Sequence, residues 1–282
     1  MSYIEHKVHS QGLQYIEVNS PMCHAHIFLQ GAQVTHFQPK NQPSLLWISQ
    51  AETYEKGVSM RGGIPICWPW FGLHPEPDYP QHGFARHKIW HLERIQESEQ
   101  EVLITLTLPT SEIETQFWPH RTQLTVTIAL STQLKISLTT QNNEDYPIKF
   151  SQALHTYFDI QNIKKLKVDG LVNTPYIEFN QNKHQTAGEV SIYKETDRMY
   201  HNASSTQQLK TTQGTIVVKR EHSSSCVLWN PWIEKSKRLS NFNQDDYLHM
   251  VCLEACNILD DSVDLKPHET FTLSQTIYWQ TS

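Results

Sequence analysis

Thr122–Leu130 reads TQLTVTIAL, and after a gap of three residues Leu134–Thr140 reads LKISLTT. In both segments apolar residues alternate with polar ones. Successive side chains of a β-strand point to opposite faces, so this period of two is typical of strands with one buried face. We therefore interpret the stretch as two strands of a half-buried sheet.

Comparable runs recur along most of the chain, whereas only Glu234–Leu248 resembles a short helix, and weakly. Strands at this density without alternating helices predict an all-β sandwich of large antiparallel sheets with few short helices. We find no internal repeat, linker or low-complexity tract, so residues 1–282 are expected to form one domain. The other predicted strands are Glu101–Leu108, Gly214–Glu221, Ser225–Asn230, Met250–Asn257, Thr270–Trp279 and the N-terminal runs LQYIEV, HAHIFLQ, AQVTHFQ and SLLWI.

Composition and charge narrow the class of protein. The 282 residues are 38% hydrophobic and 18% charged, as in ordinary soluble proteins, and the net charge of −6 argues against nucleic acid or an anionic membrane as a partner. No apolar run approaches a membrane span, and the first residues contain no signal-peptide core. The five cysteines are odd in number and form no CxxC pair, which favours reduced thiols. We expect a cytoplasmic protein.

One irregular region interrupts the strand pattern. Arg61–Gly72 reads RGGIPICWPWFG, and Gln81–Arg86 reads QHGFAR. Proline fixes backbone angles and glycine permits close approach, so such a loop can be rigid without regular hydrogen bonds. We predict an ordered binding loop, in which Trp68 and Trp70 either contact a ligand or pack in the core.

Two ionisable residues in strand-like runs are candidates for acid/base chemistry. Glu254 lies in MVCLEACN, and a carboxylate among apolar residues is costly to bury unless it is paired. His155 lies in ALHTYFDI, on the same strand face as Tyr157. The chain has sixteen histidines, so a single one is poor evidence of function, and this segment alone favours a hydrogen-bonded structural histidine. The alternative to a catalytic role is that Glu254 forms a structural ion pair with an arginine. Together the two residues could form a general acid/base pair.

Other motifs carry weaker signals. Trp229 begins WNPW, where aromatic faces beside amides suit sugars, although core tryptophans are the plain alternative. Asp197 and Arg198 stand in what reads as a polar connection with solvated charges. His24-Ala-His26 has the spacing of a cupin-like metal site, but we favour an ordinary histidine pair because no carboxylate partner is evident. No cysteine has zinc-site spacing, so we expect no metal.

Six motifs follow one another along the chain in this order: RGGIPICWPWFG, QHGFAR, ALHTYF, TDRMY, WNPW and VCLEACN. With these motifs the chain resembles the hexose-6-phosphate mutarotases (glucose-6-phosphate 1-epimerases) of the aldose 1-epimerase superfamily. The resemblance spans nearly the whole chain. It implies a galactose-mutarotase-like β-sandwich that interconverts the α and β anomers of a hexose 6-phosphate, without metal or cofactor. We expect a monomer whose partner is the sugar phosphate.

The resemblance also implies roles for individual residues. His155 corresponds to the general acid and Glu254 to the general base, while His82 and Asp197 would bind the sugar. We place Gln81 and Trp229 among the substrate contacts as well. Arg61 and Arg86 match arginines that would favour a phosphorylated substrate. One departure is Trp68-Pro69-Trp70, where the family more often has Phe-Pro-Gln.

Two other classes of function stay open at this point. A non-catalytic carbohydrate-binding sandwich could use the tryptophan-rich loop as a platform, but it would not need an acid and a base. A carbohydrate lyase or hydrolase is the third candidate. A hydrolase requires two carboxylates across the scissile bond, and the sequence offers Glu254 as the single convincing one.

Overall fold

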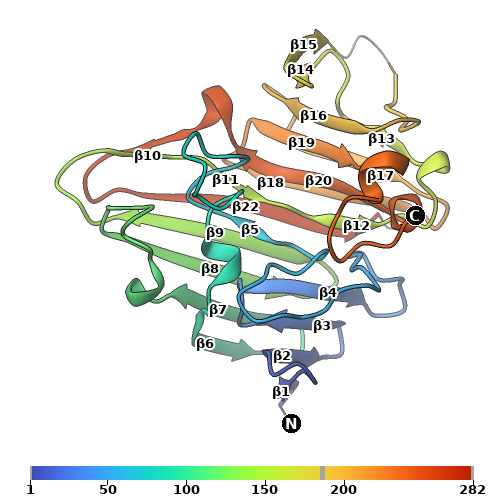
Figure 1. Cartoon of the computed structure of the whole chain (residues 1–282). Coiled ribbons are helices and arrows are strands. Elements are labelled where there is room, and N and C mark those ends of the chain that lie inside the picture. The colour runs from blue at the N-terminus through green and yellow to red at the C-terminus, as the bar shows by residue number, and fades with distance from the viewer. Residues whose placement is uncertain (1, 185–187, 281–282) are drawn as a thin grey trace.

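A computed structural model describes residues 2–184 and 188–280, and its regular structure consists mainly of antiparallel strands (Figure 1). The strands form two sheets of eight, one of four and one of two. The predicted all-β sandwich of large antiparallel sheets is thus confirmed. No helix among these residues is long and apolar enough to cross a membrane.

The first eight-stranded sheet carries most of the motifs singled out above. Its order is β15-β14-β16-β19-β20-β11-β5, and β12 also pairs with β20. In chain order its strands are β5 (Ile66–Cys67), β11 (Gln152–Leu154), β12 (Tyr157–Asp159), β14 (Pro175–Glu178), β15 (Gln181–His184), β16 (Thr196–Tyr200), β19 (Ser225–Asn230) and β20 (Met250–Asn257).

The second eight-stranded sheet has the order β13-β17-β18-β22-β9-β8-β7-β6 and contains the opening stretch as β8 and β9. Along β8, Leu124, Val126 and Ile128 are buried while the residues between them are half-exposed, as the alternation predicts. Its strands are β6 (His91–Glu97), β7 (Val102–Leu108), β8 (Thr122–Leu130), β9 (Leu134–Asn142), β13 (Lys167–Asp169), β17 (Thr206–Lys210), β18 (Thr215–Glu221) and β22 (Thr270–Trp279).

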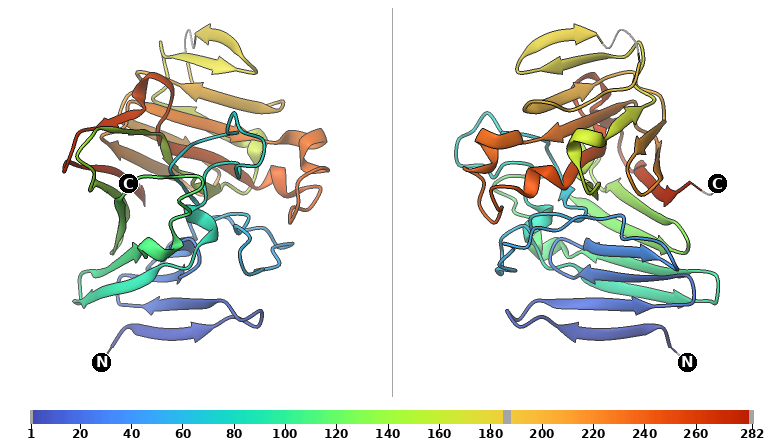
Figure 2. Two further views of the ribbon diagram at one scale, coloured as in Figure 1. Left: turned by 60° about the vertical axis from the view of Figure 1, so that its left-hand side comes forward. Right: turned by 90° about the vertical axis from the view of Figure 1, so that its right-hand side faces the viewer.

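The N-terminal strands form a separate four-stranded sheet, drawn in blue at one end of the molecule in both views of Figure 2. Its strands are β1 (Ile4–Val8), β2 (Gln14–Asn19), β3 (Cys23–Phe28) and β4 (Gln33–Pro39), and the two-stranded sheet consists of β10 (Ile148–Phe150) and β21 (Val263–Leu265). The run SLLWI makes only isolated bridges, so the strand expected there is absent. The weak helix signal over Glu234–Leu248 corresponds to the short helix α1 (Trp232–Ser236) and the 3-10 turn η4 (Asp246–Leu248).

One large apolar cluster joins the sheets, with members such as Ile16 on β2, Val126 on β8 and Leu253 on β20. Strand β20 differs from the others because all eight of its residues are buried. Buried on both faces, it shows no alternation, and Glu254 at its centre is removed from water. All five cysteines are buried and free, as expected.

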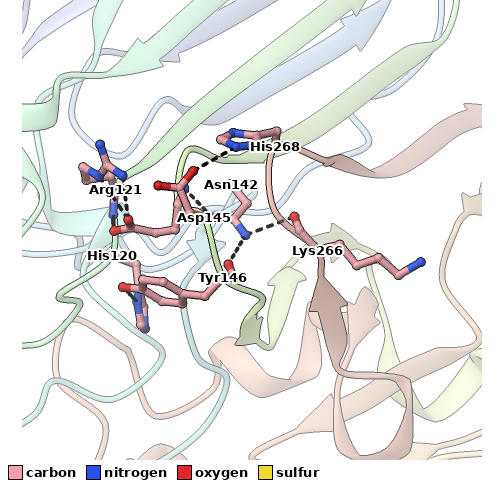
Figure 3. Close-up of polar contacts among 8 residues, drawn as sticks. His120, Arg121, Asn142, Asp145, Tyr146, Lys266 and His268 are labelled. Atoms are coloured by element: carbon pink, nitrogen blue, oxygen red, sulfur yellow. Dashed lines mark hydrogen bonds and ion pairs between the residues drawn. The ribbon is translucent and has the colours of Figure 1, made fainter.

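Polar contacts fix the connection that follows β9 (Figure 3). The Asn142 side-chain amide donates to the carbonyls of Tyr146 (2.9 Å) and Lys266 (3.0 Å). His268 contacts Asp145 at 3.1 Å, and Arg121 Nε donates to Glu144 at 3.0 Å. This polar cluster joins the segments after β9 and after β21. None of its members lines the pocket described next, so they serve as controls below.

Candidate active site

A pocket of about 470 Å³ opens on the first eight-stranded sheet, and its volume lies in the range of small-molecule sites. Its walls come from the irregular loop and from β12, β16, β19 and β20. The eight residues proposed from the sequence all line it: Arg61, Gln81, His82, Arg86, His155, Asp197, Trp229 and Glu254.

His155 and Glu254 face each other at the floor of the pocket. Strands β11 and β12 pair with successive parts of β20, and His155 lies in the break between them. The expectation of a histidine within a continuous strand is therefore wrong in this detail. The break brings His155 Nε2 to 3.4 Å from Glu254 Oε1, and the His155 ring stacks on Tyr157 with centroids 4.9 Å apart. Glu254 is thus paired with a histidine and not with an arginine.

Burial controls the protonation of this pair. Burial lowers the pKa of His155 to about 3, and the charge of Arg86 acts in the same direction. Burial raises the pKa of Glu254 well above its ordinary value, and Asp197 adds to the effect. An ionised Glu254 would favour a protonated His155; desolvation opposes that, and the free pocket favours a neutral imidazole beside a protonated carboxyl. This state has the same number of protons as an imidazolium–carboxylate pair, so one proton transfer interconverts them.

The irregular loop is held in place by backbone geometry. Gly83 has a φ of +71°, and a Cβ there would lie 2.0 Å from the Trp68 carbonyl oxygen, so only glycine fits. The neighbouring His82 accepts a hydrogen bond on Nδ1 from the Gly72 N–H at 3.1 Å. Burial lowers the pKa of His82 well below its ordinary value, so the ring is neutral and carries its hydrogen on Nε2. His82 Nε2 lies 3.2 Å from the side-chain amide of Gln81, another pocket residue, so a hydrogen bond to a ligand would replace or share that contact.

Three cationic side chains line the pocket: Arg61, Arg86 and Lys235. Within the described residues, the Arg61 side chain makes only two long hydrogen bonds, at 3.4 Å each, to the Tyr157 hydroxyl and the Ser240 carbonyl. Arg86 donates to the Gln81 carbonyl at 2.7 Å. Lys235, on α1, was missed from the sequence because an isolated lysine in a polar segment gives no signal. Its ammonium lies 5.7 Å from the centre of the Trp229 ring.

Unpaired polar atoms accompany these charges. Within the described parts of the chain, Arg86 Nε, His155 Nδ1 and Glu254 Oε2 are buried without a hydrogen-bond partner. Such atoms are costly to leave unpaired. Three of the five such atoms among the described residues belong to residues that line this one pocket, which marks it as a candidate functional site.

Asp197 and Arg198 are not in a polar connection with solvated charges, as the sequence suggested, but on strand β16. Arg198 points away from the pocket, where it is buried and donates to Glu178 at 2.9 Å. Asp197 lines the pocket and lies 3.7 Å from Lys235. Burial raises the pKa of Asp197, and the charge of Lys235 opposes that rise.

The structure separates the aromatic residues of the loop by role. Trp68 is fully buried and donates to the Thr140 hydroxyl at 3.1 Å, and Trp70 donates to the Pro80 carbonyl at 2.8 Å. Neither lines the pocket, whereas Phe71 and Trp229 do. Trp68 and Trp70 are therefore packing residues, and the departure from the family pattern at this position leaves the pocket wall unaffected.

The fold and the pocket together define the class, an antiparallel β-sandwich of the galactose-mutarotase type. A model of the aldose 1-epimerase family matches residues 14–278. The chain belongs to the aldose 1-epimerase family.

Individual relatives agree with this assignment. A protein of Salmonella typhimurium, named as a proposed glucose-6-phosphate 1-epimerase, is 33% identical over 246 residues, covering 86% of this chain and 82% of that protein. One from Cenchrus ciliaris with the same name is 31% identical, covering 88% of this chain and 78% of its own length. The crystal structure of a proposed mutarotase from Salmonella typhimurium superposes with a TM-score of 0.92 at 29% identity, covering 99% of this chain and 94% of that one.

Proposed function

We propose that this protein interconverts the α and β anomers of a hexose 6-phosphate, with glucose 6-phosphate as the expected substrate. The observation that carries the proposal is the 3.4 Å contact between His155 and Glu254 inside a pocket lined by Arg61, Arg86 and Lys235. An acid/base pair suits the proton transfers of anomerisation, and the cations suit a phosphate. The names of the relatives from Salmonella typhimurium and Cenchrus ciliaris support the same substrate.

In the proposed reaction Glu254, as carboxylate, removes the proton from the C1 hydroxyl while His155, as imidazolium, protonates the ring oxygen. The bond between C1 and the ring oxygen breaks and gives the open-chain aldehyde. The aldehyde turns about its bond to C2, and the ring oxygen attacks the other face of C1. On closure His155 takes back the proton of the C5 hydroxyl and Glu254 returns its proton to O1, so both groups regain their starting states.

The substrate itself can prepare the pair for this reaction. In the free pocket the positive charges of Arg86 and Arg61 disfavour the imidazolium form of His155. A phosphate dianion bound to these arginines offsets their charge. Proton transfer from Glu254 to His155 then becomes less costly, which links phosphate binding to the reactive state.

The alternative functions make different demands on the pocket. A carbohydrate-binding protein without catalysis needs Trp229 and Phe71 but not the contact between His155 and Glu254. A hydrolase needs two carboxylates, and Asp197 adds a second one to the pocket. The direct contact between His155 and Glu254 favours anomer interconversion over both alternatives.

Exchange NMR on equilibrated glucose 6-phosphate tests the proposal. We expect the protein to produce exchange cross-peaks between the α and β H1 resonances that are absent with buffer alone, and weaker ones with glucose. Sugar-dependent shifts of protein resonances without faster exchange would indicate the carbohydrate-binding alternative. Cleavage of an aryl glycoside would indicate the hydrolase.

The pKa shifts predict an unusual pH dependence. The reactive pair holds one proton, and a second one binds only near the lowered pKa of His155, about 3. On the alkaline side the proton is lost as the pH rises through the raised pKa of Glu254. We therefore expect kcat/KM for unphosphorylated glucose, which reports the pKa values of the free enzyme, to stay constant from about pH 7 to 5, a range that spans the ordinary histidine pKa of about 6.5. A fall in this kcat/KM with an apparent pKa near 6.5 on acidification would contradict this assignment.

A further inference from the structure

A second cluster of ligating side chains lies on the four-stranded N-terminal sheet. Glu17 on β2, His24 and His26 on β3, and His36 on β4 lie on the face opposite the core, because their neighbours in the strands are buried. The strand register sets Glu17 opposite His26, and His26 opposite His36. Cross-strand pairing thus collects one carboxylate and three imidazoles on one surface.

The distances within this cluster resemble those of a metal site. Glu17 Oε1 lies 3.0 Å from His24 Nε2 and 3.3 Å from His26 Nε2. Zinc bonds of about 2.0–2.2 Å at tetrahedral angles separate neighbouring ligand atoms by about 3.3 Å. One ligand atom from each of these three residues lies within 4.8 Å of the others.

His36 completes the group. Its ring centroid lies 5.0 Å from that of His24 and 5.2 Å from that of His26. A rotation of this half-buried side chain could bring in a fourth ligand. The carboxylate partner that seemed absent from the sequence is therefore present, since Glu17 lies on the adjacent strand and not near the motif in sequence.

Metal binding needs an ionised carboxylate with an oxygen free to coordinate the ion. Lys7 contacts the other oxygen, Oε2, so Oε1 still faces the histidines.

We propose that Glu17, His24 and His26, with His36 as the fourth ligand, bind a divalent transition-metal ion, Zn²⁺ in the first instance. Imidazole and carboxylate donors suit Zn²⁺, Cu²⁺ and Ni²⁺, whereas Mg²⁺ and Ca²⁺ prefer oxygen ligands. The ion ties β2, β3 and β4 together. None of the four ligands lines the sugar pocket, so the site is separate from the proposed catalysis.

Calorimetric titration of the chelator-treated full-length protein with Zn²⁺ tests the proposal. We expect one equivalent to bind, Mg²⁺ to give no binding, and Zn²⁺ to raise the melting temperature. Because the variant His24→Ala/His26→Ala removes two ligands, its affinity should fall by about 100-fold or more. Tetrahedral Co²⁺ absorption should appear in the wild-type protein and be lost in this variant.

His268→Ala is the matched control, because His268 also contacts a carboxylate, Asp145, at 3.1 Å but belongs to no group of three or more potential metal ligands among the described residues. Its Zn²⁺ affinity should equal that of the wild type. If the double variant does not fold, Glu17→Gln keeps the size of the side chain and should still weaken binding by about 10-fold. Absence of stoichiometric Zn²⁺ binding, or unchanged affinity in the variants with altered ligands, would overturn the proposal.

Discussion

Replacing Glu254 by Gln is expected to lower kcat for the anomerisation of glucose 6-phosphate by about 10²–10⁴-fold, and His155→Ala by a similar factor. Each change removes one partner of the proton transfers at O1 and at the ring oxygen. The double variant should lose little more activity than either single variant, because the effects of replacing residues that act as a unit are not additive. Exchange NMR at saturating substrate measures the rates.

The fold should survive the glutamate substitution. Burial already raises the pKa of Glu254, so a neutral amide of the same size removes a desolvation cost. Glu144→Gln is the matched control, since Glu144 is also a buried carboxylate but lies in the polar cluster of Figure 3, away from the pocket. Rates near wild type for both Glu254→Gln and His155→Ala would show that the acid/base assignment is wrong.

Arg61→Ala is expected to raise KM for glucose 6-phosphate by about 10–100-fold, the effect of losing a charge-assisted hydrogen bond of about 1.5–3 kcal/mol. The kcat/KM for unphosphorylated glucose should change much less. Arg61 suits this test because the hydrogen bonds of its side chain to the protein are long, 3.4 Å each, so truncation of the side chain disturbs little else. Progress curves with both sugars give the selectivity ratio.

Two further variants complete that experiment. Arg121→Ala removes an exposed arginine of the polar cluster in Figure 3 and should leave both sugars unaffected. Arg86→Ala should also reduce the preference for the phosphorylated sugar, although it loses the bond to the Gln81 carbonyl as well. The ratio between the two sugars separates the phosphate role from a general loss of stability. Equal losses for both sugars with Arg61→Ala would remove that role.

Local patterns account for much of the fold. Alternation identified β7, β8 and β9 because each has one face in the core and one toward solvent. The same rule failed at SLLWI, whose backbone makes only two isolated bridges, one to Phe158 on β12 and one to Gly62 in the irregular loop. It also failed at TDRMY, where charges suggested a solvated connection. Arg198 is buried there because Glu178, twenty residues away, neutralises it.

The sequence by itself determined that this is a β-sandwich and which side chains to examine, since strand period and motif order are local properties of the chain. Only the tertiary structure decided which of these side chains meet. The contact between His155 and Glu254 depends on a break between β11 and β12 opposite β20, and α1 adds a third pocket cation, Lys235, to the two arginines. Protonation likewise follows from burial, which is a property of the packed sheet. For the same reason Glu17 became a partner of His24 and His26 only when strand pairing brought β2 beside β3.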